Sequence, residues 1–410
     1  MTRIAVLTIG TELLDGRVSD SNTADIARAL QQSGLQLAES RCVADIPDMI
    51  ADQLREMSCS CAVLLVTGGL GPTDDDLTAA AAANAFDLPL HENHTALSLI
   101  EDFFHRTARP MHTANRKQAL LPAGALPIPN PSGSAPGFLL AQQQCRIYFL
   151  PGVPREMQVM LQESVLPQLT ALFPAPPRKR KTFKVLGIAE SHLQEKLRPL
   201  TFPEGLDPTF TLDYPLVLLG FEASGQQADT LLERCAEMVR PLLDTALVAE
   251  DAQTLPGVVA ELLQQHSLTL SLAESCTGGL VASLLTDIPG TSRFLERGAV
   301  TYANSAKQDW LGVPETDLEQ HGAVSEEVAR AMATGIRKAA GTDLALGITG
   351  IAGPDGGTPE KPVGTVFVAL ATAEQCLVEP LKLQGDRAHI RRAAAFRSLD
   401  LLRRHLTQQL

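Results

Sequence analysis

The stretch Cys61-Ala-Val-Leu-Leu-Val-Thr-Gly-Gly-Leu-Gly-Pro-Thr-Asp-Asp-Asp76 joins a short apolar run to a glycine-rich turn that ends in three acids. The run Cys61–Thr67 has the length and composition of a strand that is buried on both faces. Glycines permit tight turns, and a helix that begins just after such a turn points its first amide groups at the space above the sheet edge. The stretch therefore predicts an α/β fold with a binding site at the end of this strand.

A second stretch of the same kind lies in the other half of the chain. There a predicted strand, Leu268–Leu272, leads into Ala273-Glu-Ser-Cys-Thr-Gly-Gly279 and a predicted helix over Gly279–Leu285. Two such corners on one polypeptide indicate two separate sites.

The rest of the chain alternates strands and helices around these corners, a pattern typical of mostly parallel sheets covered on both faces. We predict an α/β protein with two three-layer α/β/α domains, residues 1–173 and 251–410. The segments that support this are strands over Ile4–Ile9, Arg146–Leu150, Ala299–Tyr302, Leu344–Thr349 and Thr365–Leu370, and helices over Ser21–Leu30, Thr78–Asn84, Met157–Leu166, Ser325–Ala340 and Arg387–Leu406.

Residues 174–250 are predicted to hold a linker and a small α+β module. Prolines and basic residues crowd Phe173–Lys181, and prolines deny a sheet its donors. The basic run Arg178–Lys181 admits two interpretations, a docking patch or a solvated hinge, and its shortness favours the hinge. Strands over Phe183–Ile188 and Leu216–Phe221 and a helix over Ala228–Leu243 complete the module.

Composition limits the function classes. The 410 residues carry a formal net charge of -13, which argues against direct binding to nucleic-acid backbones. Seven scattered cysteines without a Cys-x-x-Cys pair indicate neither a disulfide framework nor a thiolate zinc site. No apolar run has the length of a signal peptide or a membrane span, so we expect a soluble cytoplasmic protein without a membrane partner.

Ser275 is the candidate nucleophile of the second corner, because a hydroxyl there faces amide groups suited to a developing oxyanion. His321 is a possible base, but it falls in a predicted loop. Lys307 is the better candidate, since burial in the following helix lowers the pKa of an amine, and Tyr302 is placed to relay or orient the proton. Two alternatives stay open: Ser275 as a helix N-cap, and Cys276 as a competing nucleophile or as a small buried apolar residue.

A third loop, Thr349-Gly-Ile-Ala-Gly-Pro-Asp-Gly-Gly357, ends another predicted strand at the same sheet edge. Beyond it, Arg387 begins the last helix. An arginine at a helix start is poorly placed for the helix dipole but well placed for an anion, so it predicts a phosphate contact, with simple solvation as the alternative.

These motifs together closely resemble the nicotinamide mononucleotide (NMN) deamidase family over roughly Leu255–Leu406. The resemblance rests on the Ser275 corner, Gly298–Lys307, His321–Ser325 and the Thr349 loop. It implies hydrolysis of the nicotinamide carboxamide without a cofactor, giving nicotinic acid mononucleotide and ammonia. It also implies roles by motif position: Ser275 as nucleophile, Lys307 with Tyr302 as base, and Thr277, Gly278, Gly279, Thr349, Gly350 and Arg387 as substrate contacts.

The first corner lacks both the Gly-Lys-Ser/Thr of a P-loop and the third glycine of a dinucleotide fingerprint. Its combination of turn amides and acids suits a phosphate-bearing ligand together with a divalent metal, for which Asp75 and Asp76 are the candidate ligands. The two aspartates are equally interpretable as acids in the first turn of a helix, which the helix dipole favours.

Further fragments make the first domain similar to the molybdopterin-binding domain of the competence/damage-inducible protein A family, in which a deamidase domain follows in the same order. They are Gly10–Gly16, Asp20–Asn22, Asn115–Gln118, Asn130–Gly137 and Leu150–Glu156, with Gly133-Ser134 where the family often has Gly-Thr. The resemblance implies a metal-dependent ADP-ribose pyrophosphatase, with Mg or Co as the cation, and a homodimer. The substrate contacts implied on this side are Gly69, Gly71, Thr73, Asn115, Lys117 and Ser134.

We therefore expect a hydrolase of pyridine nucleotide salvage that acts on NMN and ADP-ribose. The alternative is a catalytically silent protein that binds a nucleotide or pterin, or an adaptor linked to competence or DNA damage.

Overall fold

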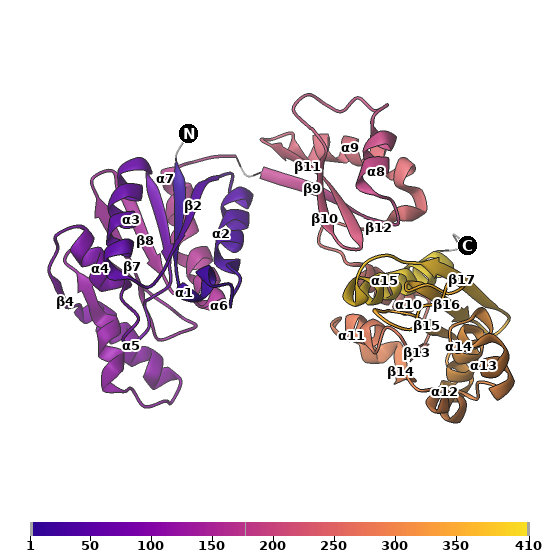
Figure 1. Ribbon diagram of the computed structural model, residues 1–410. Helices are drawn as coiled ribbons and strands as arrows, with labels where there is room; N and C mark the ends of the chain where they lie inside the picture. The colour runs from indigo at the N-terminus through magenta and orange to yellow at the C-terminus, as the bar shows by residue number, and fades with distance from the viewer. Residues whose placement is uncertain (1–2, 177, 408–410) are drawn as a thin grey trace. The chain divides into compact units, whose positions relative to one another are not determined.

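The computed structural model describes residues 3–176 and 178–407. Its contacts divide the chain into two compact units, Met1–Lys179 with Ser224–Ala228, and Arg180–Ala223 with Asp229–Leu410 (Figure 1). Each unit is described by itself.

The first unit is built on a six-stranded sheet in the order β2-β1-β3-β8-β7-β6. The β1–β2, β1–β3 and β3–β8 pairs are parallel, and β7 and β6 extend the sheet antiparallel. The strands are β1 Ile4–Ile9, β2 Leu37–Val43, β3 Val63–Thr67, β6 Leu126–Ile128, β7 Gly137–Gln142 and β8 Cys145–Leu150. A separate pair joins β4 Leu90–Glu92 to β5 Leu120–Pro122.

Helices cover both faces of this sheet, as the alternation along β1 requires. Ala5, Leu7 and Ile9 belong to one apolar cluster and Ile4 and Val6 to another, so successive side chains of the strand enter opposite cores. The helices are α1 Thr11–Leu14, α2 Ser21–Gln32, α3 Pro47–Ser60, α4 Thr78–Ala85, α5 His94–Arg106, and α6 Pro154–Met160, which a π-helical turn joins to α7 Leu166–Leu172.

The second unit begins with a four-stranded sheet in the order β10-β11-β9-β12. Its chain order is β9 Arg178–Leu186, α8 Glu190–Leu197, β10 Thr209–Asp213, β11 Leu216–Ser224, α9 Ala228–Leu243 and β12 Leu247–Glu250. This β-α-β-β-α-β order with an inner first strand is the ferredoxin-like topology.

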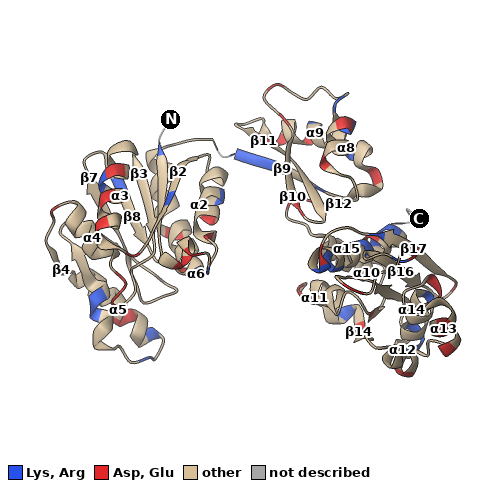
Figure 2. Cartoon of the chain, in the orientation of Figure 1, with Lys and Arg blue, Asp and Glu red and all other residues tan. Residues whose placement is uncertain are grey.

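The basic run Arg178–Lys181 forms the first half of β9 and not the loop predicted for a hinge, while the boundary between the two units falls within it, between Lys179 and Arg180 (Figure 2). Acids on the neighbouring strands pair with the cations. Arg180 lies 3.3 Å from Glu222 of β11, and Lys181 lies 2.6 Å from Glu250 of β12. A charged run is therefore accommodated in an inner strand.

A five-stranded sheet, in the order β14-β13-β15-β16-β17, carries the second glycine-rich corner. The β13–β14 and β13–β15 pairs are parallel, and the β15–β16 and β16–β17 pairs are antiparallel. The strands are β13 Leu270–Glu274, β14 Leu295–Val300, β15 Leu344–Gly350, β16 Thr365–Ala371 and β17 Cys376–Lys382. The helices are α10 Leu255–Gln265, α11 Leu280–Thr286, α12 Asn304–Leu311, α13 Glu315–His321, α14 Glu326–Ala340 and α15 Arg387–Leu406.

The two faces of this sheet pack differently. Large aliphatic residues, with Leu272 and Ile348 among them, meet α10, α11 and α15 on one face. The other face is lined by small residues against α14, and at Gly347 an added Cβ would lie 2.6 Å from the backbone of Ala329 and Ala333. The glycine therefore allows the helix to lie directly on β15.

The predicted α/β class with mostly parallel sheets is confirmed. The three-part division of the chain stays a prediction, because Leu216 and Val248 of the ferredoxin-like sheet share an apolar cluster with Leu255 and Ile390. Two local predictions are wrong. His321 ends α13 instead of lying in a loop, and β14 ends at Val300, two residues before Tyr302.

Candidate active sites

Ser275 directly follows β13 and begins the turn Ser275–Gly279 that leads to α11. Its amide donates to the carbonyl of Ile348 on β15 at 3.0 Å, and its carbonyl accepts from Gly278 at 3.1 Å. Gly278 and Gly279 have φ values of +62° and +87°, a left-handed conformation that glycine adopts without strain. The turn therefore holds a nearly buried hydroxyl at the carboxyl edge of the sheet.

Several amide groups of this turn have no oxygen acceptor, and those of Cys276 and Thr277 lie near the sulfur of Cys276, where they act to lower the pKa of its thiol against the larger effect of burial. Among the residues that the structure describes, the N–H groups of Cys276, Thr277 and Gly279 donate to no backbone or side-chain oxygen. The first amides of α11 are occupied instead, since the buried carboxylate of Glu274 accepts from Val281 and Ala282. Unpaired turn amides are the groups that stabilise an oxyanion when one forms nearby.

Lys307, on α12, lies 99% buried beside the serine. Its Nζ donates to Ser275 Oγ at 3.3 Å and to the carbonyls of Thr301 at 2.8 Å and Tyr302 at 3.1 Å. Burial lowers the pKa of the amine, because the charged form loses its hydration. When the amine is neutral, the two carbonyls hold its two N–H bonds and its lone pair is directed at the serine hydroxyl.

The predicted substrate contacts lie on the loops around this pair. Arg387 donates to the phenolic oxygen of Tyr302 at 2.9 Å and to the carbonyl of Gly353 at 2.7 Å. The described residues show no hydrogen bond between the Tyr302 hydroxyl and Lys307, so the tyrosine meets the lysine through its backbone. Thr349 is buried beside the turn, and its hydroxyl donates to Ala323 at 2.7 Å.

The two competing candidates differ from Ser275 and Lys307 in their surroundings. Cys276 points into the apolar cluster under the sheet, and burial raises the pKa of its thiol to about 12. His321 lies at the exposed end of α13, where its Nδ1 is 3.7 Å from Glu327. Neither side chain has a described hydrogen bond to Ser275.

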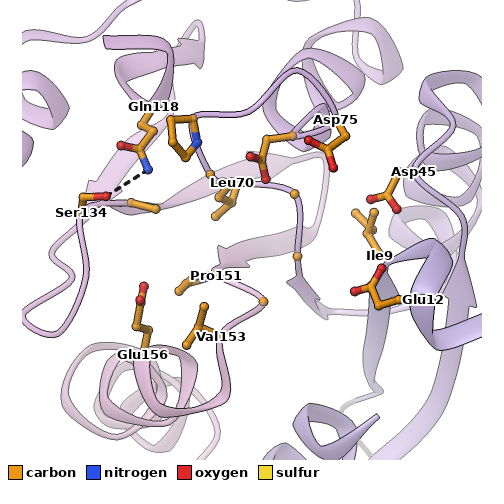
Figure 3. Close-up of a pocket in the computed structure, with 17 residues that line it drawn as sticks. Ile9, Glu12, Asp45, Leu70, Asp75, Gln118, Ser134, Pro151, Val153 and Glu156 are labelled. Atoms are coloured by element: carbon orange, nitrogen blue, oxygen red, sulfur yellow. Dashed lines mark hydrogen bonds between the residues drawn. The ribbon is translucent and has the colours of Figure 1, made fainter. Parts of the chain in front are cut away.

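A cavity of about 500 Å³ lies at the carboxyl ends of β1, β3 and β8 in the first unit (Figure 3). Four glycines and five acids are among its lining residues, together with apolar residues, Gln118 and Ser134, and no Lys or Arg lines it. The lining glycines are Gly68, Gly69, Gly71 and Gly152, and the acids are Glu12, Asp45, Asp75, Asp76 and Glu156.

Two family matches cover most of the chain. A probable molybdopterin binding domain matches residues 5–171, and the CinA C-terminal domain matches residues 252–406. A CinA-like protein from Syntrophotalea carbinolica is 50% identical over 404 residues, which are 98% of each chain. The chain belongs to the CinA family. A second CinA-like protein, from Citrifermentans bemidjiense, is 47% identical over 98% of this chain and 97% of its own.

A solved structure aligns with part of the chain. A competence/damage inducible protein from Agrobacterium tumefaciens is 40% identical to it and covers 38% of this chain and 99% of its own, with a TM-score of 0.35. The two family matches and the CinA-like relatives confirm the CinA resemblance expected from the sequence. No helix among residues 3–176 and 178–407 is long and apolar enough to cross a membrane.

The cavity of the first unit brings together only part of the predicted contacts. Gly69, Gly71, Ser134, Asp75 and Asp76 line it. The side chains of the other three predicted contacts form hydrogen bonds within the protein. The Thr73 hydroxyl donates to Asp76 at 2.6 Å, and Lys117 donates to the Thr73 carbonyl. The side-chain amide of Asn115 accepts from the His112 backbone and donates to Gln118.

Asp75 and Asp76 do not lie in the first turn of a helix, which was the alternative interpretation. Both precede α4, which begins at Thr78 and has no acid in its first turn. The Thr73 hydroxyl lowers the pKa of the Asp75 carboxyl by stabilising its charged form. Among the described residues no three His, Cys, Asp or Glu side chains are arranged to hold a metal ion, so a cation here would need ligands from substrate and water.

Sequence reasoning missed several residues of both sites. Glu12, Asp45 and Glu156 follow β1, β2 and β8 and line the cavity. Their position after strands could have identified them, because the carboxyl ends of parallel strands meet at one edge of a sheet. Glu274 and Arg391 of the C-terminal site had no such signal, because each acts through contacts with the backbone of the Ser275 turn or of α11.

Proposed function

We propose that the C-terminal part of this CinA-family chain is an amidohydrolase that converts NMN and water to nicotinic acid mononucleotide and ammonia. The observation that carries the proposal is the 3.3 Å contact between Lys307 Nζ and Ser275 Oγ in a buried setting that favours the neutral amine.

The reaction follows from this pair in two halves. Neutral Lys307 accepts the proton of Ser275 as Oγ attacks the carboxamide carbon, and the unpaired amides of the turn stabilise the oxyanion. The lysine then returns the proton to the departing nitrogen, which leaves as ammonia. Water, deprotonated by the same amine, cleaves the acyl-serine and restores the hydroxyl.

Ammonia release from NMN by the full chain tests the proposal. Ser275→Ala is expected to lower kcat by about a thousandfold or more, because the nucleophile is gone. Cys276→Ala is the matched neighbour and is expected to retain activity within about threefold, since its thiol is buried and protonated. Turnover that survives in Ser275→Ala and disappears in Cys276→Ala would move the role to the thiol.

A binding protein without turnover is the competing class. Saturable NMN binding by wild type, with no ammonia released, would favour a silent nucleotide-binding or adaptor role. Tight retention on DNA at low salt would favour the adaptor, against the net charge of -13.

We propose ADP-ribose hydrolysis as a second activity, supported by the cavity of about 500 Å³ that combines turn glycines with carboxylates. Release of AMP from ADP-ribose is expected to require Mg²⁺ or Co²⁺, because five acids around a diphosphate repel it without a cation. Asp75→Ala is expected to weaken turnover, and Asp102→Ala, an exposed acid on α5, is the control. Undiminished activity in excess chelator would contradict the cation requirement.

We also propose that the chain is cytoplasmic and that it forms a homodimer. Analytical ultracentrifugation of the full chain tests the dimer.

A further inference from the structure

Arg391, on α15, reaches the Ser275 turn from 114 residues away. Its Nη2 and Nε donate to the carbonyl of Thr277 at 2.9 Å and 3.3 Å. The neighbouring residues Ile390 and Ala394 are buried in the core, so the helix offers a fixed base for the guanidinium group.

The peptide unit that Arg391 contacts is held at both ends. Its carbonyl belongs to Thr277, and its N–H belongs to Gly278, which donates to Ser275 at 3.1 Å. A peptide unit is planar, so fixing both ends fixes its plane. Within the turn, the Thr277 carbonyl accepts only a longer bond from the Leu280 amide at 3.3 Å, and the adjoining Gly278 and Gly279 restrict the backbone little, so the 2.9 Å bond from Arg391 adds the firmer constraint on the orientation of this unit.

The absence of a side chain at Gly278 also serves this contact. An added Cβ at Gly278 would lie 3.3 Å from Arg391 Nη2, closer than most such contacts. The guanidinium group therefore lies directly against the backbone of the turn. Glu274 holds the start of α11, because its carboxylate accepts from the backbone amides of Val281 at 3.2 Å and Ala282 at 2.9 Å.

We propose that Arg391 is a positioning residue for the amide hydrolysis proposed above, on which this inference rests. By holding the Thr277–Gly278 peptide, it keeps Ser275 Oγ aligned with Lys307 and keeps the amides of the turn available to an oxyanion. A displacement of about 1 Å in such a site costs about a hundredfold in rate.

Arg387, one helical turn earlier, has a different environment and provides the contrast. It is exposed, and its guanidinium group donates to the Tyr302 hydroxyl and to the Gly353 carbonyl. A substrate phosphate could replace these two acceptors. Loss of a substrate contact raises KM, whereas loss of a positioning contact lowers kcat and leaves KM nearly unchanged.

The test compares Arg391→Gln and Arg391→Lys with Arg397→Gln in the full chain. Arg397 lies on the same helix and has no described contact with the Ser275 turn. With NMN as substrate, Arg391→Gln is expected to lower kcat by about a hundredfold with KM within about threefold. Arg391→Lys, which keeps the charge but donates from a single nitrogen, is expected to lose less, and Arg397→Gln is expected to match wild type.

A fluorophosphonate gives a second readout that does not depend on NMN. Ser275 Oγ forms a bond to phosphorus, the P–F bond breaks, fluoride leaves and the serine proton passes to Lys307. The labelling rate, followed by intact mass, is expected to fall in Arg391→Gln in parallel with kcat. If that variant does not fold, as judged by thermal unfolding, Arg391→Lys carries both measurements.

The outcomes separate the two proposals. A raised KM with unchanged kcat and labelling would make Arg391 a substrate contact and overturn the inference, as would wild-type values for all three. If wild type releases no ammonia but is labelled at Ser275, and Arg391→Gln is labelled more slowly, the NMN activity fails and the positioning role stands.

Discussion

Lys307 Nζ lies 3.3 Å from Ser275 Oγ, and the carbonyls of Thr301 and Tyr302 take its other two hydrogen bonds. The lysine thus has a defined orientation as well as a depressed pKa. An amine held by two acceptors in a buried site can donate to the serine only when charged and can accept from it only when neutral. The chemistry of the site depends on which form is present.

Lys307→Met is expected to lower kcat for NMN by about a hundredfold to ten-thousandfold, the usual contribution of a general base. Lys307→Arg is expected to be equally inactive, because a guanidinium group does not lose its proton in proteins. Ammonia release measures both. Lys338→Met, at the exposed end of α14, is the control, and equal losses in Lys307→Met and Lys338→Met would remove Lys307 from the mechanism.

The pH profile follows from the direction of the lysine shift. Burial makes the ammonium form costly, so half of the amine is neutral at a pH below the ordinary lysine value of about 10.4. Because the neutral form is the base, kcat/KM is expected to rise with pH to a plateau and to fall as the pH drops through this lowered pKa. Initial rates between about pH 5 and about pH 12, a range that includes the ordinary lysine value, measure it. An activity limb at or above the ordinary value would contradict a neutral base.

Cys276 is expected to resist thiol reagents, because its pKa of about 12 leaves almost no thiolate at neutral pH. Cys59 is exposed and is the internal comparison. Brief treatment of the native chain with iodoacetamide, followed by peptide mass mapping, is expected to modify Cys59 and leave Cys276 free. Rapid modification of Cys276 together with loss of NMN turnover would show a reactive thiol at the site.

Local pattern was sufficient for the parts of the fold that depend on neighbours in sequence. The helices over Ala228–Leu243 and Arg387–Leu406 begin and end where the sequence predicts, and the second begins at a local cap, in which the Asp386 carboxylate accepts from the His389 amide. The strand-turn corners at Gly68 and Ser275 were also predictable, since glycine-rich turns after apolar runs have few alternatives.

Features that depend on distant partners were not predictable in this way. The basic strand β9 is stable because Glu222 and Glu250, remote in sequence, face its cations. The contact of Arg391 with Thr277 spans 114 residues and follows no motif. Pattern reasoning found the two site loops, but it could not find the side chains that hold them.

Arg387→Gln is expected to raise KM for NMN by about tenfold to a hundredfold with a smaller change in kcat, because a charged contact to phosphate is worth about 1.5–3 kcal/mol. The matched control is the dephosphorylated substrate, nicotinamide riboside, on which wild type and variant are expected to be equally poor. Steady-state ammonia release measures both substrates. A loss of equal size on the riboside would show that Arg387 acts through Tyr302 and Gly353, its present partners, and not through a phosphate.

Gly347→Ala tests the close packing that supports the site, because β15 also provides the Ile348 carbonyl that holds Ser275. The new Cβ would lie 2.6 Å from the backbone of α14, so the variant is expected to lose about 1–3 kcal/mol of stability. Gly298→Ala in β14 is the matched control: its Cβ would meet Ala282 at an ordinary 3.5 Å, and its stability is expected to stay within about 1 kcal/mol of wild type. Trp310 of α12 is the single tryptophan of the chain, so its fluorescence during urea unfolding reports this part of the protein alone. Equal midpoints for the two variants would mean that α14 can move away from β15 without cost, and the packing argument would fail.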